Sequence, residues 1–251
     1  MLLIVGFGFV GKAYTQAFGY TQKLGIVDPA YTDNKISDFT EVKGIIICVP
    51  TPEAEDGSCD TSYVESVLRE CPDVPIMLKS TISLEGWKHI KAEFGHLKIA
   101  FSPEFLRADT ATEDVLATKH VIISGDNINF WFEVYEKAFP NITASYMSVE
   151  EAITVKYFRN SFLATKVAFF NQIYDFCEKL GVDYNVVSAG IIRDDRIGSS
   201  HTKVNKNDRG FGGYCFPKDT SALLYTSTIA LGVDLSILEA AVLYNNDIRN
   251  E

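Results

Sequence analysis

The first thirty residues constrain the fold more than any other stretch. Residues 2–5 (LLIV) form a continuous apolar run, which predicts a strand buried on both faces. A GxGxxG turn follows at residues 6–11, and then come a predicted helix over 10–18 and a second apolar strand over 24–27. Asp28 ends that strand, roughly twenty residues beyond the glycines. This order of strand, glycine turn, helix, strand and acid predicts a dinucleotide-binding βαβ unit.

Each glycine of this turn has its own expected role. Gly6 allows the tight turn, Gly8 the close approach of a pyrophosphate, and Gly11 the contact between helix and strand. Asp28 would accept hydrogen bonds from a ribose diol and repel a 2′-phosphate, and neither of the next two residues is an arginine, so NAD is favoured over NADP. The alternative is a βαβ turn without a cofactor. We expect the cofactor to be bound by this βαβ unit and by residues that follow later strands or motifs. These residues are Gly6, Gly8, Phe9, Val10, Gly11, Asp28, Pro50, Thr51, Thr81 and Lys218.

The alternation of strands and helices continues to residue 147. Further strands are expected over 44–49, 75–79, 97–101 and 120–124, and helices over 62–70, 85–94 and 130–139. The pattern predicts an α/β fold with a doubly wound parallel Rossmann sheet, in a domain covering 1–147. Ligands of such sheets bind beyond the carboxyl ends of the strands, where Thr51, Thr81 and Glu104 fall. A helix cap or turn also explains each threonine, whereas the apolar neighbours of Glu104 suggest that it is partly buried.

From residue 148 the pattern changes to that of a helical domain, 148–251. Residues 150–180 contain no glycine or proline and are dense in apolar side chains, which predicts one long helix. Lys156 and Asn160 share a face of it. Its apolar residues exceed what one buried face needs, so this helix should be buried between two domains or two subunits. We expect the second arrangement, a homodimer through this helix. The further elements expected are a short helix from a cap at Asp183 to residue 192, a loop over 193–211 and helices over 220–231 and 235–250.

The segment 210–219 (GFGGYCFPKD) concentrates reactive residue types. Pro217 suits the first turn of a helix, because its missing N–H costs nothing there. Cys215 would then lie just before the helix N-terminus, whose partial positive charge lowers a thiol pKa. Cys215 is therefore a candidate nucleophile, with Lys218 and Asp219 in the first turn. The alternative is a glycine-rich turn with a buried structural cysteine.

Charge and cysteine content narrow the class of partner. The net charge of −10 argues against nucleic acid or an anionic membrane as the main ligand. The sequence contains no run of about 18 apolar residues, so we expect no membrane-spanning helix. The five cysteines are an odd number without CxxC spacing, which favours a reducing cytoplasm and no structural metal. A small-molecule substrate is the expected partner.

A series of short motifs points to one family. They are residues 6–11 (GFGFVG), 49–52 (VPTP), 60–62 (DTS), 79–82 (KSTI), 102–107 (SPEFLR), 156–160 (KYFRN), 169–171 (FFN) and 212–219 (GGYCFPKD). In this order they resemble the UDP-glucose/GDP-mannose dehydrogenase family, most closely its UDP-glucose 6-dehydrogenases. Members oxidise the primary alcohol of a sugar nucleotide to a carboxylate with two NAD+, as from UDP-glucose to UDP-glucuronate, a polysaccharide precursor.

The resemblance implies a role for each matching residue. Cys215 would hold the aldehyde-level carbon as a thiohemiacetal, which a second oxidation turns into a thioester that water hydrolyses. Lys156 with Asn160 suits a developing oxyanion, and Glu104 would be the base for hydrolysis. The implied catalytic residues are Cys215, Lys156, Asn160, Asp219, Glu104 and Thr81. The implied substrate-binding residues are Phe105, Leu106, Arg107, Lys156, Asn160, Phe211 and Gly212.

The sequence departs from the family in two places. Ala108 stands where members usually have a second glutamate, which weakens the expected water-handling network. The residues end at Glu251, before the second nucleotide-binding-like domain of family members, so we expect normal NAD binding but weak binding of UDP-glucose. Basic residues of the 193–211 loop could contact a diphosphate or simply be solvated: Arg193, Arg196, Lys203, Lys206 and Arg209.

Two other functions remain open at this point. A two-electron NAD-dependent dehydrogenase of a smaller alcohol or hydroxy acid would leave Cys215 unexplained. A non-catalytic NAD-binding partner protein is the other alternative.

Overall fold

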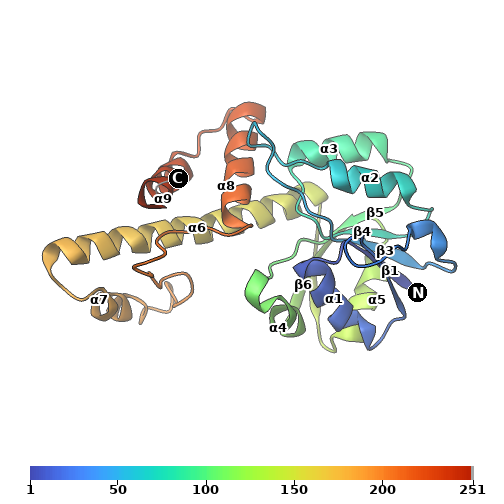
Figure 1. The fold of residues 1–251 in the computed structure, drawn as a ribbon, viewed down its shortest axis with the longest axis horizontal. Coiled ribbons are helices and arrows are strands. Elements are labelled where there is room, and N and C mark those ends of the chain that lie inside the picture. Colours follow the sequence, from blue (N-terminus) through green and yellow to red (C-terminus); the bar gives the residue numbers. More distant parts are fainter. Residues whose placement is uncertain (250–251) are drawn as a thin grey trace. The chain divides into compact units, whose positions relative to one another are not determined.

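The computed structural model describes residues 1–249, which form two compact units. The first unit comprises Met1–Ala54 and Cys59–Lys156, and the second comprises Glu55–Ser58 and the chain from Tyr157 onward. The boundary therefore lies inside the long helix α6, Val149–Leu180, which is drawn in yellow in Figure 1. The sequence predicts a boundary after residue 147, just before the start of this helix.

The first unit is built on a seven-stranded sheet in the order β2-β1-β3-β4-β5-β6-β7. The strands are β1 Leu2–Val5, β2 Leu24–Val27, β3 Gly44–Ile47, β4 Ile76–Leu78, β5 Ile99–Phe101, β6 His120–Gly125 and β7 Thr143–Met147. β1 to β5 are mutually parallel, and β1 and β3 are buried at every residue. The continuous apolar runs of the sequence thus correspond to strands covered on both faces, which confirms the expected fold class.

The sheet differs from the expected one at one edge. β6 pairs with β5 in antiparallel fashion, with Phe101 opposite Ser124, and β7 is parallel to β6. The sheet is therefore mostly parallel, and its last two strands run the other way. β7 was not expected from the sequence, because no residue of this edge strand is fully buried and its side chains do not form an apolar run. The direction of β6 leaves no trace in hydrophobic periodicity.

Helices cover both faces of the sheet, with α2 and α3 on one face and α1, α4 and α5 on the other (Figure 1). Their bounds are α1 Phe9–Gly19, α2 Ser62–Glu70, α3 Leu84–Glu93, α4 Ala111–Leu116 and α5 Ile128–Ala138. α4 is a further element that the sequence analysis did not predict. The large buried side chains Phe18, Trp131 and Tyr135 of α1 and α5 pack against the sheet and form the main core.

The second unit is helical. After α6 come α7 Tyr184–Ile191, α8 Phe216–Tyr225, a π-helical turn Thr226–Ala230, and α9 Ser236–Arg249. The Asp183 side chain caps α7 by accepting from the Asn185 N–H at 2.8 Å, as expected. α8 begins at Phe216, next to Cys215 as Pro217 predicted, and four residues before the start at 220 that was expected for the helix over 220–231. Asn250, the expected end of the last helix, lies outside the described residues. Within residues 1–249, no helix combines the length and apolarity needed to cross a bilayer.

Candidate active site

The glycine turn after β1 has a geometry that only glycine can adopt. Gly6 has φ +92°, and a Cβ there would lie 2.7 Å from the backbone of Cys48. A Cβ on Gly11 would lie 2.0 Å from the Gly6 carbonyl oxygen, so α1 could not approach β1 so closely. A Cβ on Gly8, the N-cap of α1, would meet nothing within 4 Å. The turn therefore leaves open space at a helix N-terminus, where backbone N–H groups have no intrahelical acceptor.

Asp28, at the end of β2, is tied to this turn. Its Oδ2 accepts from the Phe7 N–H at 2.6 Å, and its Oδ1 accepts from the Ala30 N–H at 2.9 Å. Each carboxylate oxygen can accept a further hydrogen bond, so the group remains able to bind two hydroxyls. The structure thus places the acid against the glycine turn, as a dinucleotide site requires.

Three expected site residues follow three neighbouring strands. Thr51 comes after β3, Thr81 after β4 and Glu104 after β5, and these strands are parallel and adjacent in the sheet. Their carboxyl ends share one edge, which the reversal of β6 and β7 does not affect. The strand order reverses between β1 and β3, so the glycine turn and Pro50 lie on either side of the switch point where cofactors bind in such sheets.

Glu104 and Lys156 form a buried ion pair. The Lys156 Nζ donates to the Glu104 Oε1 at 2.8 Å and to the Glu104 backbone carbonyl at 2.6 Å, and both side chains are almost fully buried. The Leu106 N–H donates to the Glu104 Oε2 at 2.7 Å, and the Phe105 ring lies 5.5 Å from the Lys156 Nζ. Burial alone would raise the pKa of Glu104, but Lys156 and the Leu106 N–H outweigh it and hold this pKa below its usual range.

Arg107, expected to bind substrate, is engaged within the first unit. Its Nε lies 3.0 Å from the Asp114 Oδ2, and its backbone N–H donates to the same oxygen at 2.9 Å. These contacts lower the pKa of Asp114 to about 2. Asp114 belongs to α4, so the interaction ties the segment after β5 to a helix that the sequence analysis did not predict.

Cys215 lies at the N-cap of α8, and Pro217 is in the first turn. The Asp219 carboxylate is buried and shared between two donors: the Asn160 Nδ2 at 2.6 Å and the Lys218 Nζ at 2.7 Å. These contacts lie within the second unit. Asn160 of α6 therefore meets Lys218 and Asp219 of the first turn of α8 in one polar network next to the cysteine.

Cys48 and Cys71 differ from Cys215 in their surroundings. Burial raises the pKa of the Cys48 thiol to about 12, and burial together with Glu70 raises that of Cys71 to about 12. Thiols with such pKa values hold almost no thiolate near neutral pH, so neither is suited to nucleophilic attack. No disulfide joins any of the five cysteines, all of which lie in the described part of the chain.

Two of the basic residues of the loop over 193–211 form ion pairs within the second unit. Arg196 pairs with Asp194, and Arg209 is held by Asn171 and Asp175 of α6. Asn245 of α9 also holds this region, because it forms hydrogen bonds with the backbone of Phe211. This role of Asn245 was not expected from the sequence. The sequence signals for these residues are the motif at residues 169–171, which contains Asn171, and the position of both asparagines as polar residues within apolar helical patterns; both are buried.

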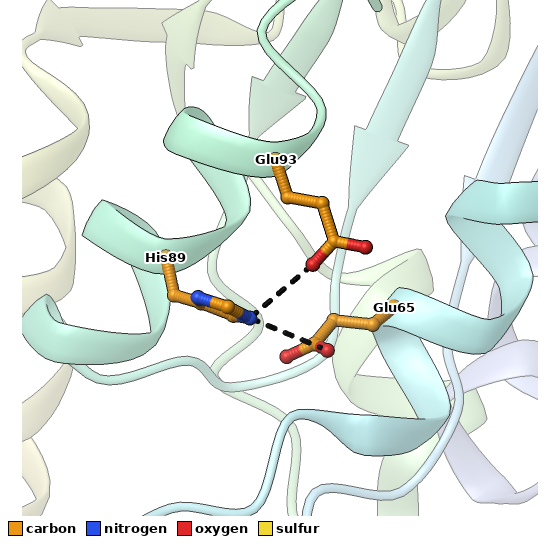
Figure 2. Close-up of side chains that lie close together, drawn as sticks. All are labelled: Glu65, His89 and Glu93. Atoms are coloured by element: carbon orange, nitrogen blue, oxygen red, sulfur yellow. Dashed lines mark ion pairs between the residues drawn. The ribbon is translucent and has the colours of Figure 1, made fainter.

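A separate cluster on the surface of the first unit could offer ligand atoms to a metal ion. Figure 2 shows Glu65 of α2 beside His89 and Glu93 of α3, with the His89 Nε2 at 3.6 Å from Glu65 and 3.3 Å from Glu93. The Arg69 guanidinium lies 2.8 Å from Glu93 and 3.5 Å from Glu65. A cation of the chain itself thus already compensates both carboxylates, and the cluster joins α2 to α3 as a set of ion pairs.

An open sheet whose first turn carries GxGxxG, with an acid after the second strand, defines the class of dinucleotide-binding Rossmann proteins. Comparison with known proteins narrows this class. Residues 29–139 match the NAD binding domain of the UDP-glucose/GDP-mannose dehydrogenase family, and residues 150–247 match its central domain. The chain belongs to this family, which confirms the expected family, its NAD cofactor and the class of NAD-dependent nucleotide-sugar dehydrogenase.

Individual relatives of the chain are UDP-glucose dehydrogenases. A UDP-glucose 6-dehydrogenase of Campylobacter jejuni is 29% identical, with 100% of this chain and 72% of the relative covered. One of Rickettsia bellii is 32% identical, with 91% and 55% covered. The solved UDP-glucose dehydrogenase of Pyrobaculum islandicum superposes with a TM-score of 0.84 at 28% identity, with 99% and 68% covered. The chain thus spans between about half and three quarters of the length of these proteins.

Proposed function

We propose that the chain catalyses the NAD-dependent oxidation of the primary alcohol of a UDP-sugar to a carboxylate, with UDP-glucose as the substrate and UDP-glucuronate as the product. The observation that carries the proposal is the placement of Cys215 at the N-cap of α8, directly before the buried Asp219–Asn160–Lys218 network. A two-electron alcohol dehydrogenase needs no such nucleophile. The relatives named above, themselves UDP-glucose 6-dehydrogenases, support the same reaction.

The first unit fits NAD. The open space at Gly8 and the N-terminus of α1 suit the pyrophosphate, and the Asp28 carboxylate suits the ribose diol. Its charge disfavours a 2′-phosphate, so NAD is preferred over NADP. Bound there, NAD supplies the acceptor for the hydride of each oxidation step.

The chemistry at Cys215 follows from its position. The first oxidation removes a hydride and the hydroxyl proton from the primary alcohol and gives an aldehyde. The helix N-terminus favours the Cys215 thiolate, which attacks the aldehyde carbon and forms a C–S bond, and the carbonyl oxygen takes up a proton. Loss of a hydride from this thiohemiacetal, together with its hydroxyl proton, gives a thioester. Water then attacks the thioester carbon, the C–S bond breaks, and the carboxylate leaves with the thiol restored. In total one alcohol and one water are converted to a carboxylate while two NAD+ are reduced.

Glu104 and Lys156 have complementary roles, because Glu104 can accept a proton and Lys156 can donate a hydrogen bond to an oxyanion. The paired Glu104 is held as a carboxylate at neutral pH, which is the form that accepts a proton from an attacking water. Lys156 is its counter-charge and can instead donate to an oxyanion when substrate is present. Thr81, which follows β4, is proposed to position the water. Phe105, Leu106, Arg107, Phe211 and Gly212 are proposed to contact the sugar nucleotide.

We further propose a homodimer through α6. Its side chains Phe158, Phe162, Phe169 and Phe176 are between 48% and 68% exposed. They are separated by four, seven and seven residues, which places them on a single stripe of the helix. An apolar groove of about 350 Å³, lined partly by Phe169 and Ile237, continues this stripe onto α9. A second copy of α6 is the partner that fits this stripe.

The five cysteines without disulfides fit a cytoplasmic protein.

The test of the reaction is the ratio of NADH formed to UDP-glucose consumed. Two NADH per sugar, with UDP-glucuronate as the product, is the expected result. One NADH per sugar would identify a two-electron dehydrogenase. No NADH with any member of a panel of UDP- and GDP-sugars would indicate a non-catalytic NAD-binding protein.

A further inference from the structure

The backbone just before the cysteine segment is held by one side chain. The Asn245 Oδ1 accepts from the Phe211 N–H at 2.6 Å, and its Nδ2 donates to the Phe211 carbonyl at 3.1 Å. Asn245 is 2% exposed. A buried amide is costly unless its donor and acceptor are both used. Here both are used on a single residue, so the amide fixes the position and the orientation of that peptide segment.

Gly210 makes this close approach possible. It has φ +75°, and a Cβ there would lie 2.4 Å from the Asn245 Oδ1. Any other residue would be strained at this φ, and its Cβ would displace the Asn245 side chain from the segment.

A second anchor acts on the two preceding residues. The Asn171 Oδ1 accepts from the Gly210 N–H at 3.2 Å and from the Arg209 Nε at 2.6 Å. The Arg209 guanidinium also contacts Asp175 at 2.9 Å and lies 4.6 Å from the centre of the Tyr174 ring. Residues 209–211 are thereby fixed to α6 by one asparagine and to α9 by the other.

The anchors reach the cysteine through two aromatic rings. Phe211 is buried, and its ring meets the Phe216 ring edge-on, with the ring centres 6.3 Å apart. Phe216 is the first residue of α8 and follows Cys215 directly. Gly212 and Gly213 between them would otherwise leave the segment many conformations.

We propose that Asn245 is a positioning residue for Cys215, with Asn171 as its second support. The amide of Asn245 holds Phe211, Phe211 orients Phe216, and Phe216 keeps Cys215 at the N-cap where the helix favours its thiolate. This inference rests on the proposed role of Cys215 as the nucleophile. Preorganisation of this kind matters because a misplacement of about 1 Å can reduce a rate about a hundredfold.

The test compares Asn245→Ala with Asn246→Ala, the same change at the next residue of α9, where the side chain is only half-buried. Cys215 alkylation by iodoacetamide is followed by peptide mass spectrometry across pH, without substrate or cofactor, and kcat, KM and the Kd for NAD+ are measured alongside. For Asn245→Ala we expect a higher pH midpoint of alkylation and a kcat lower by roughly tenfold to a hundredfold. The NAD+ Kd should stay within about twofold, since that site lies in the first unit.

Asn246→Ala should match the unsubstituted protein in every measurement. Asn245→Asp, which keeps the acceptor and loses the donor, gives an intermediate shift if Asn245 positions the thiol, and it covers the case in which the alanine variant fails to fold. An unchanged alkylation midpoint and kcat in folded Asn245 variants would overturn the proposal. If the unsubstituted protein oxidises no sugar nucleotide while the alkylation midpoint still depends on Asn245, the proposed function fails and the positioning role stands.

Discussion

The two units of the molecule differ in how completely they cover their own apolar residues. In the first unit β1 and β3 are buried at every residue, and the charged side chains of Glu104 and Lys156 are buried as an ion pair. In the second unit, polar groups such as Asn160, Asn171 and Asn245 hold other parts of the backbone and side chains in place. The first unit completes its own core, while the second leaves a row of phenylalanines exposed on α6. Helices of the first unit cover both faces of its sheet, whereas the apolar residues of α6 extend over more of the helix surface than its own unit covers.

The largest expected effect of a substitution is at Cys215, in the second unit. We expect Cys215→Ser to lower the rate of full oxidation by at least about a thousandfold, because a serine hydroxyl is a poorer nucleophile at neutral pH. NAD+ affinity, a property of the first unit, should be unchanged. The measurement is two-NADH turnover together with calorimetric NAD+ titration. Cys71→Ser is the control and should keep full activity. Undiminished turnover of Cys215→Ser would make Cys215 a structural residue.

The ion pair of the first unit gives the next largest effect. Lys156→Met leaves a carboxylate buried without its counter-charge, which we expect to cost about 3–5 kcal/mol of unfolding free energy. Both tryptophans, Trp87 and Trp131, lie in the first unit, so their fluorescence during denaturation reports on this unit alone. The exposed Lys179→Met is the control.

A double variant tests whether the loss belongs to the pair. Adding Glu104→Gln to Lys156→Met should recover part of the stability, because no unpaired charge then remains. Strictly additive losses would show that the two residues act separately.

The exposed stripe of the second unit should show itself in association. Phe162→Glu places a charge at a side chain that is 68% exposed, and we expect the dimer Kd to rise at least about tenfold. Analytical ultracentrifugation over a concentration series measures the change. Val186→Glu, at a similarly exposed apolar residue of α7, is the control. A monomeric mass for the unsubstituted protein at micromolar concentration would remove the basis of the dimer proposal.

The smallest effect is the response of the first unit to acid. The pKa of Glu104 is held below its usual range in the folded chain, so its contribution to stability is complete above the unfolded pKa of about 4.3. That contribution is lost as pH falls through the lower, folded pKa. Urea titrations between pH 5.5 and 3, followed by tryptophan fluorescence, should show a steeper loss for the unsubstituted protein than for Glu104→Gln. Equal slopes would mean that other carboxyl groups dominate.

Much of the fold could be predicted from the sequence, because the signals involved are local. The apolar runs located β1 to β6, and the glycine spacing indicated the turn whose Gly6 and Gly11 leave no room for a Cβ. Pro217 placed the start of a helix next to Cys215, and the structure has α8 beginning at Phe216. The motifs also indicated the family. Such features depend on residues within a few positions of each other, which the chain order itself records.

The pairing of distant groups was decided only by the tertiary structure. Lys156 and Glu104 were each given a catalytic role from the sequence, yet they are 52 residues apart and bond to each other. Asn245 meets Phe211 across 34 residues, and the reversed β6 and the edge strand β7 left no periodic signal. Residue types show what a side chain can bond. Which group it meets depends on how the elements pack, because one donor in a sequence has many acceptors and only the folded core selects among them.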